Sequence, residues 1–167
     1  TIIGTYTPCT RMNTAVVDEK RLDHERLLVD HFRKVQAEGK PVFLTGDLNV
    51  APTPNDITLS NARQAVKPGS KSHERELLAR FKARTNTVDV QDYLNTAGLP
   101  LAKTWGGPMR WSARLDLTLG ERRHLGPHSA AQPLGTRLVR METINDFYGS
   151  DHKAMASYFS DQLSEDN

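Results

Sequence analysis

The chain has 167 residues, of which 37% are hydrophobic and 25% are charged, and its formal net charge is +2. This length fits one domain with a core of ordinary size. The single cysteine, Cys9, excludes an internal disulfide framework and favours a reducing compartment, so we expect an intracellular protein, nuclear or cytoplasmic. The sequence has neither an apolar run as long as a membrane span nor a basic tract long enough to bind nucleic acid by itself.

The first part of the chain predicts a strand, a helix and a second strand. Residues 1–7, "TIIGTYT", have a strand-like composition and end at Pro8. Apolar residues recur at helical spacing within residues 18–38, and Gly39 closes that helix. The nearly continuous apolar run of residues 40–45 predicts a strand that is buried on both faces.

The remainder of the chain predicts mainly strands. Residues 51–70 are rich in turn formers, whereas residues 72–84 predict an amphipathic helix. The segment "TVDVQDYL" fits either a short strand or the start of a turn. Three further strands are predicted at residues 114–119, 136–144 and 152–159. This mixed order indicates an α+β fold or a layered sandwich, with residues 161–167 as a frayed tail.

Two polar pairs follow glycine turns. Asp47 and Asn49 come directly after the predicted buried strand, and Asp151 and His152 follow "GS" near the end of the chain. If the backbone stays extended, residues two apart point to one side, where an acid and an amide can bind a cation or orient a water. A simple turn explains the first pair equally well. For the second pair alone, a turn before the last strand is the better explanation.

A third polar residue, Asp116, alternates with leucines in "RLDLTL". If this carboxylate is buried it needs a partner, and a histidine is a suitable one because the acid fixes its tautomer. An exposed strand aspartate is the alternative. Together the three clusters suggest a metal-assisted hydrolase that acts on a phosphate ester. Trp105 and Trp111 fit packing, which is the more common role of a lone tryptophan, or stacking on a base, which the flanking Arg110 and Arg114 support to some extent for Trp111.

The order of these motifs resembles a known family. "TYTP", "GDLNVAPTPNDI", "HERE", "TW", "RLDLTL" and "GSDH" occur in the order typical of the exonuclease III and AP endonuclease branch of the endonuclease/exonuclease/phosphatase family. The resemblance extends over most of the chain, and "GDLNVAP" followed by "DI" is its most specific part. It implies a DNase I-like, four-layered α/β sandwich that is built from two mixed β-sheets and flanking helices.

The resemblance also implies roles for individual residues. The implied reaction is hydrolysis of DNA phosphodiester bonds with Mg²⁺ or Mn²⁺, as in DNA repair. The implied catalytic residues are Asp47, Asn49, His152, Asp116 and Tyr6. Asp47 and Asp151 are the implied metal ligands. Tyr6, Asn49, Trp105 and Trp111 are the implied substrate-binding residues.

Other motifs of the family are missing. The sequence has no "WN" strand and no strand that ends in a metal-binding Glu, and it opens within a strand without an initiator Met. We therefore expect residues 1–160 to be the C-terminal portion of a single domain, a monomer without membrane contact that needs the missing half for activity. Two alternatives stay open. One is an inactive or non-catalytic remnant of the fold, and the other is a phosphoesterase that acts on a lipid or inositol phosphate.

Overall fold

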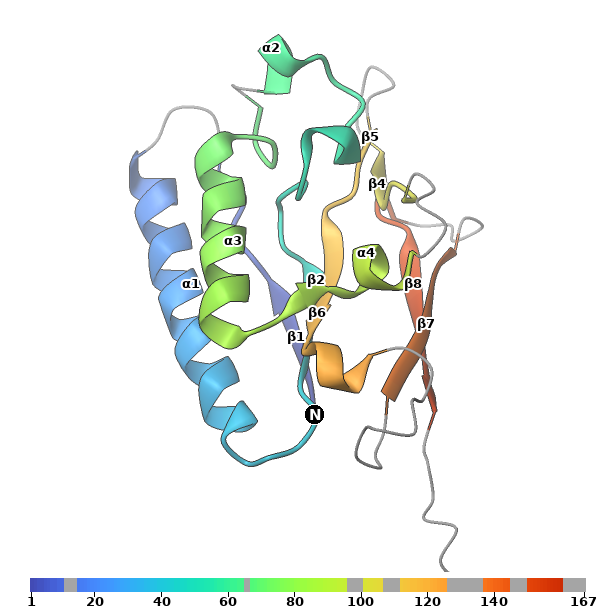
Figure 1. Cartoon of the computed structure of the whole chain (residues 1–167). Coiled ribbons are helices and arrows are strands. Elements are labelled where there is room, and N and C mark those ends of the chain that lie inside the picture. The colour runs from blue at the N-terminus through green and yellow to red at the C-terminus, as the bar shows by residue number, and fades with distance from the viewer. Residues whose placement is uncertain are drawn as a thin grey trace, which may run out of the picture.

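A computed structural model describes residues 1–10, 15–64, 67–95, 101–106, 112–125, 137–144 and 150–160. Helices and strands alternate irregularly along the chain, as the sequence predicts (Figure 1). The helices are α1 (Ala15–Gln36), α2 (Asn61–Gln64), α3 (Ser72–Thr85) and α4 (Val90–Leu94), with 3₁₀ turns at Pro54–Asp56 and Arg122–His124. The strands are β1 (Ile2–Tyr6), β2 (Phe43–Asp47), β3 (Val88–Asp89), β4 (Trp105–Gly106), β5 (Ser112–Ala113), β6 (Asp116–Gly120), β7 (Arg137–Ile144) and β8 (Ala154–Ser160).

The main sheet has four strands in the order β1-β2-β6-β3. β1 and β2 run parallel, and α1 connects them, whereas β6 is antiparallel to both β2 and β3. The strands β4 and β5 pair with each other, and so do β7 and β8. Because β2 and β6 run in opposite directions, the end of β2 and the start of β6 lie at the same end of the sheet.

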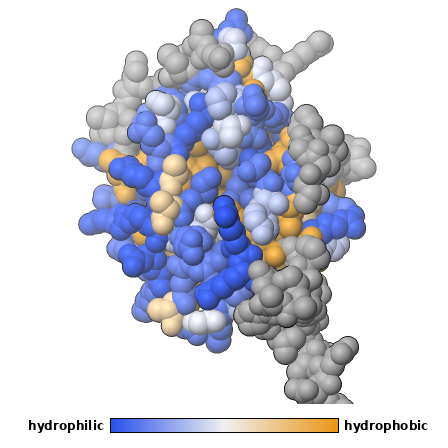
Figure 2. Space-filling view, viewed as in Figure 1, coloured by the Kyte–Doolittle hydropathy of each residue, from blue (hydrophilic) through white to orange (hydrophobic). Residues whose placement is uncertain are grey.

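Helices α1 and α3 lie side by side against one face of the main sheet (Figure 1). Their inward residues pack on leucines of β2 and β6, and Phe32 of α1 meets Phe81 of α3 edge to face at 5.7 Å between ring centroids. Buried leucines at 117 and 119 confirm that the alternating pattern of β6 directs its apolar side chains into this core. Outside the grey regions, the face of the molecule in Figure 2 is mainly hydrophilic, with smaller hydrophobic areas between.

The opposite face of the main sheet packs on the β7–β8 pair. Phe43 of β2 belongs to a buried cluster with Leu138 of β7, and its ring lies edge to face with Phe159 of β8 at 5.4 Å. A helical layer, the main sheet and the β7–β8 sheet are thus stacked in that order (Figure 1). No helix in the described part of the chain is long and apolar enough to cross a membrane.

Several predicted boundaries differ from the observed ones. The first helix spans Ala15–Gln36, although residues 18–38 were expected from the apolar spacing. β2 begins at Phe43 and continues through Gly46 to Asp47, because its residues pair with both β1 and β6 over that length. The ambiguous segment "TVDVQDYL" forms the two-residue strand β3, which passes directly into the short helix α4 and not into a turn. The predicted tail, residues 161–167, lies outside the described residues.

Candidate active site

Three polar side chains lie in one row across the main sheet. Tyr6 of β1 is the register partner of Asp47 in β2, and Asp47 is the register partner of Asp116 in β6. Register partners on neighbouring strands place their side chains on the same face of a sheet. The row therefore lies on the face opposite the α1–α3 layer, at the end of the sheet. Tyr6 is 66% exposed, so the phenol can be reached from solvent beside the two acids.

The chain leaves β2 in a tight turn that joins Asn49 to Asp47. The Asn49 backbone N–H donates to Asp47 Oδ1 at 2.8 Å, and its side-chain Nδ2 donates to Asp47 Oδ2 at 3.0 Å and to the Thr7 carbonyl at 2.9 Å. Asn49 has a left-handed backbone with φ 47°, so the expectation of an extended segment is wrong. The two residues are still brought together, because the turn directs the amide back onto the carboxylate. The simple turn and the paired amide and acid, which were alternative explanations of the sequence, are therefore both present in one structure.

Gly46 is required immediately before this turn. Its φ is 140°, and a Cβ added there would lie 2.0 Å from the Thr5 carbonyl oxygen. Side-chain-bearing residues rarely adopt that conformation, and β1 approaches too closely to admit one. The glycine of the "GDLN" motif thus allows β1 and β2 to stay paired up to Asp47.

His152 completes the polar group. Its Nδ1 lies 2.8 Å from Asp116 Oδ2, which confirms the predicted contact between these residues. Since an ionised carboxylate only accepts hydrogen bonds, Nδ1 carries the proton and Nε2 points toward Asp47, 3.9 Å from Oδ2. Ligand atoms of Asp47, Asp116 and His152 all lie within 4.8 Å of one another. Side chains separated by more than 100 positions in the sequence therefore meet in one half-buried cluster.

The environment raises the pKa of the Asp47 carboxyl above its ordinary value. Burial is the main cause, and the nearby Asp116 carboxylate adds to it. The hydrogen bond from the Asn49 backbone opposes the rise, as do the charges of His152 and Arg21. A carboxylate that is desolvated and close to a second one binds a cation or a proton more readily than an exposed acid.

Thr104 holds the segments of Asp116 and His152 together. Its side chain is fully buried, and Oγ1 accepts the backbone N–H groups of both Leu115 and Asp116 at 3.0 Å. The Thr104 carbonyl accepts the N–H of Lys153, next to His152, at 2.6 Å. This threonine was not among the predicted site residues, because nothing in "KTW" indicates which distant backbone groups it will bind.

Asp151 forms a hydrogen bond with Trp105. Its Oδ2 accepts the indole N–H of Trp105 at 2.9 Å, and it lies outside the cluster of Asp47, Asp116 and His152. The backbone of Trp105 also forms an isolated bridge with His152. The metal-binding role of Asp151 and the substrate-binding role of Trp105 stay predictions. Trp111 lies outside the described residues.

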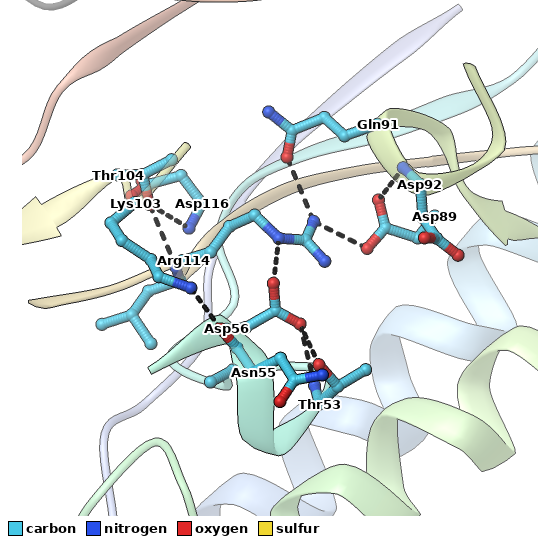
Figure 3. Close-up of polar contacts among 12 residues, drawn as sticks. Thr53, Asn55, Asp56, Asp89, Gln91, Asp92, Lys103, Thr104, Arg114 and Asp116 are labelled. Carbon is cyan, nitrogen blue, oxygen red and sulfur yellow. Dashed lines mark hydrogen bonds and ion pairs between the residues drawn. The ribbon is translucent and has the colours of Figure 1, made fainter. Parts of the chain in front are cut away.

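A buried ion network anchors the strand that carries Asp116 (Figure 3). Arg114 is 1% exposed, and its guanidinium donates to Asp56 Oδ1 at 2.8 Å and to Asp89 Oδ2 at 2.7 Å. Its NH1 also donates to Gln91 Oε1 at 3.1 Å. The suggestion that Arg114 helps Trp111 to contact nucleic acid is therefore wrong, because the guanidinium is enclosed and paired.

The same network shows the structural role of two acids, Asp56 of "APTPNDI" and Asp89 of "TVDVQDYL". Burial alone would raise the pKa of the Asp56 carboxyl, but the bonds from Arg114 and Thr53 hold it below its usual range. In the segment "TVDVQDYL", Asp89 is the acid that binds Arg114, and its side chain also caps α4 by accepting the backbone N–H of Asp92. A buried charge is tolerated when it is paired on several sides. The pairing holds the chain at Arg114, two residues before β6 begins at Asp116.

Comparison with known proteins identifies the fold. No protein-family model matches the chain, and no curated protein sequence matches it. The chain is similar to the solved structure of a 3′-5′ exonuclease from Neisseria meningitidis, with TM-score 0.74 and 16% identity over 96% of this chain and 61% of that chain. It is also similar to AP endonuclease LMAP from Leishmania major, with TM-score 0.75 and 19% identity over 97% of this chain and 50% of that one.

A third similar structure is a 3′ phosphatase from Neisseria bound to a product DNA hairpin. Its TM-score is 0.74 and its identity 15%, over 95% of this chain and 60% of that chain. At this level of identity the similarity establishes the fold, which is the DNase I-like α+β fold that the motifs implied. The chain spans 50% to 61% of the length of these structures.

The role of Thr104 leads to a first prediction. Thr104→Val keeps the shape of the side chain but leaves the N–H groups of Leu115 and Asp116 without their acceptor. We expect the variant to lose about 1–3 kcal/mol of unfolding free energy, measured by denaturant titration. Thr104→Ser retains the hydroxyl and is expected to lose much less. Equal stability of the two variants would contradict this role.

The raised pKa of Asp47 leads to a second prediction. The native state holds the Asp47 proton to a higher pH than the unfolded chain, so ionisation of Asp47 lowers stability as the pH rises through the native pKa. Asp47→Asn removes the charge and keeps one acceptor oxygen for Asn49. We expect its melting temperature at neutral pH, measured with chelator, to exceed that of the wild type.

This advantage should disappear as the pH falls below about 4, where the wild-type carboxyl is protonated as well. Asp30→Asn, at an exposed position of α1, serves as the matched control and should change the melting temperature little. A lower melting temperature for Asp47→Asn at neutral pH would show that the ionised carboxylate stabilises the fold.

Proposed function

We propose that the site is that of a divalent-cation-dependent phosphodiesterase that hydrolyses DNA, of the exonuclease III and AP endonuclease type. The observation that carries this proposal is the meeting of Asp47, Asp116 and His152 at the end of the main sheet, with Nδ1 of the histidine 2.8 Å from Asp116. The similarity in fold to an exonuclease, an AP endonuclease and a DNA-bound 3′ phosphatase supports it. The activity is proposed for the complete protein.

The side chains provide complementary functions for phosphodiester hydrolysis. Asp47 is the acceptor for a proton of the attacking water, and the Asn49 amide holds the carboxylate in place. Asp116 orients the His152 ring, whose Nε2 edge then faces the space above Asp47, where a phosphoryl oxygen would lie. Tyr6, in register with Asp47 and exposed, is placed to contact the phosphate.

The donor atoms fit a hard divalent cation. Two carboxylates and an imidazole lie within 4.8 Å of one another, and each Asp47 oxygen keeps a lone pair beyond its bond to Asn49. Carboxylate oxygens suit Mg²⁺ and Mn²⁺. When bound, such a cation supplies positive charge that stabilises phosphoryl oxygens and lowers the pKa of a bound water. Asp151 as a further ligand, a monomeric state and an intracellular location stay predictions.

The proposal is tested with the complete protein and Mg²⁺. Substrates are a duplex with an abasic site, a plain duplex with recessed 3′ ends, and a phosphoinositide, because the last tests the lipid-phosphate alternative. We expect DNA hydrolysis that Asp47→Ala and His152→Gln each reduce by at least about 100-fold, since both remove proton-transfer or positioning groups. Asp30→Asn is the control and should retain activity. Hydrolysis of the phosphoinositide alone, no hydrolysis, or full activity of Asp47→Ala would contradict the assignment.

A further inference from the structure

Arg21 lies directly behind the candidate site. It projects from α1, is 2% exposed, and its guanidinium is directed at the loops that follow β1 and β2. NH1 donates to the carbonyls of Pro8 at 3.0 Å and Asn49 at 3.2 Å, and NH2 donates to the carbonyl of Leu48 at 2.9 Å. One side chain therefore joins the ends of both parallel strands.

These acceptors flank the left-handed residue of the site. The carbonyls of Leu48 and Asn49 are consecutive, and both are directed at the same guanidinium while Asn49 holds φ 47°. Asparagine adopts this conformation more readily than other residues with a Cβ, and hydrogen bonds from the surroundings can fix it in place. The hydrogen bonds from Arg21 impose it from one side, and the Asn49 bonds to Asp47 and Thr7 impose it from the other.

Stabilisation of the fold does not by itself explain why an arginine is buried at position 21. A guanidinium taken out of water is costly, and buried charges can often be replaced by apolar side chains without loss of stability. Burial indeed lowers the pKa of Arg21, although Glu74 and other nearby acids oppose that effect. The hydrogen-bond partners of Arg21 are backbone carbonyls, whose positions decide where Asp47 and Asn49 stand.

We propose that Arg21 is a positioning residue for the hydrolytic site: it fixes the turn after β2 so that the Asn49 amide holds the Asp47 carboxylate. The inference rests on the proposed function for its effect on catalysis, whereas its effect on the turn is independent of that function. Arg21 touches no reacting group and acts through the Leu48 and Asn49 carbonyls.

The test compares Arg21→Met and Arg21→Lys with the wild type in the complete protein. Arg26→Met, at an exposed position of the same helix, is the control. The first readout is amide hydrogen exchange of Asn49, whose N–H donates to Asp47, with Leu44 in the middle of β2 as the internal reference. The second readout is kcat and KM for DNA hydrolysis.

For Arg21→Met we expect Asn49 exchange to rise about tenfold while Leu44 stays unchanged, because charge-assisted hydrogen bonds to the turn are lost. We expect kcat to fall by on the order of 10–100-fold with KM nearly constant, as for a misplaced reacting group. Arg21→Lys keeps the charge but has a single ammonium nitrogen in place of the branched guanidinium, so it cannot bind all three carbonyls in the same way. We expect intermediate values for both readouts.

Wild-type exchange at Asn49 together with wild-type kcat, in either folded variant, would overturn the inference. If Arg21→Met does not fold, Arg21→Lys decides by the same two readouts. A fall in kcat with unchanged Asn49 exchange would also overturn it, because the turn would then not be the route of the effect. Absence of hydrolysis by the wild type refutes the proposed function instead, and the exchange readout still decides the role of Arg21.

Discussion

The pairing of Asp47 with Asp116 across β2 and β6 is the contact on which the rest of the site depends. Their antiparallel register places two carboxylates side by side on one face, and the parallel pairing of β1 adds Tyr6 to the same row. A slip of one residue would turn every side chain of β6 over and send Asp116 into the core of leucines. The apolar residues that bury one face of the sheet therefore also fix the positions of the acids on the other.

Buried arginines hold the segments around this row. Arg114 anchors the start of β6 through Asp56 and Asp89, and Arg21 binds the loops that follow β1 and β2. Arg21 binds backbone carbonyls one and two residues after Asp47, and Arg114 itself lies two residues before Asp116. Sites that act on charged groups need supports of this kind, because small displacements of reacting groups are costly.

The sequence was sufficient to predict the kind of fold and part of the site. Alternation in "RLDLTL" predicted both the buried leucines and a polar Asp116, and the order of motifs led to its contact with His152. A turn at Asp47 and Asn49 was one of two open explanations, but its left-handed conformation was not predicted, because it depends on the Arg21 guanidinium of α1, which donates to the Leu48 and Asn49 carbonyls. The pairing of Arg114 with Asp56 and Asp89 was missed for a similar reason: local patterns give charge and periodicity, but the partner of a buried charge is selected by the folded chain.

The central claim is that strand ends distant in sequence form one cation-binding site. Anomalous diffraction from crystals of the complete protein grown with Mn²⁺ tests it most directly, because the ion is located without reference to activity. We predict a strong anomalous peak at coordination distance from the carboxylates of Asp47 and Asp116, beside the ring of His152. A peak only elsewhere in the molecule, or none at saturating Mn²⁺, would contradict the claim.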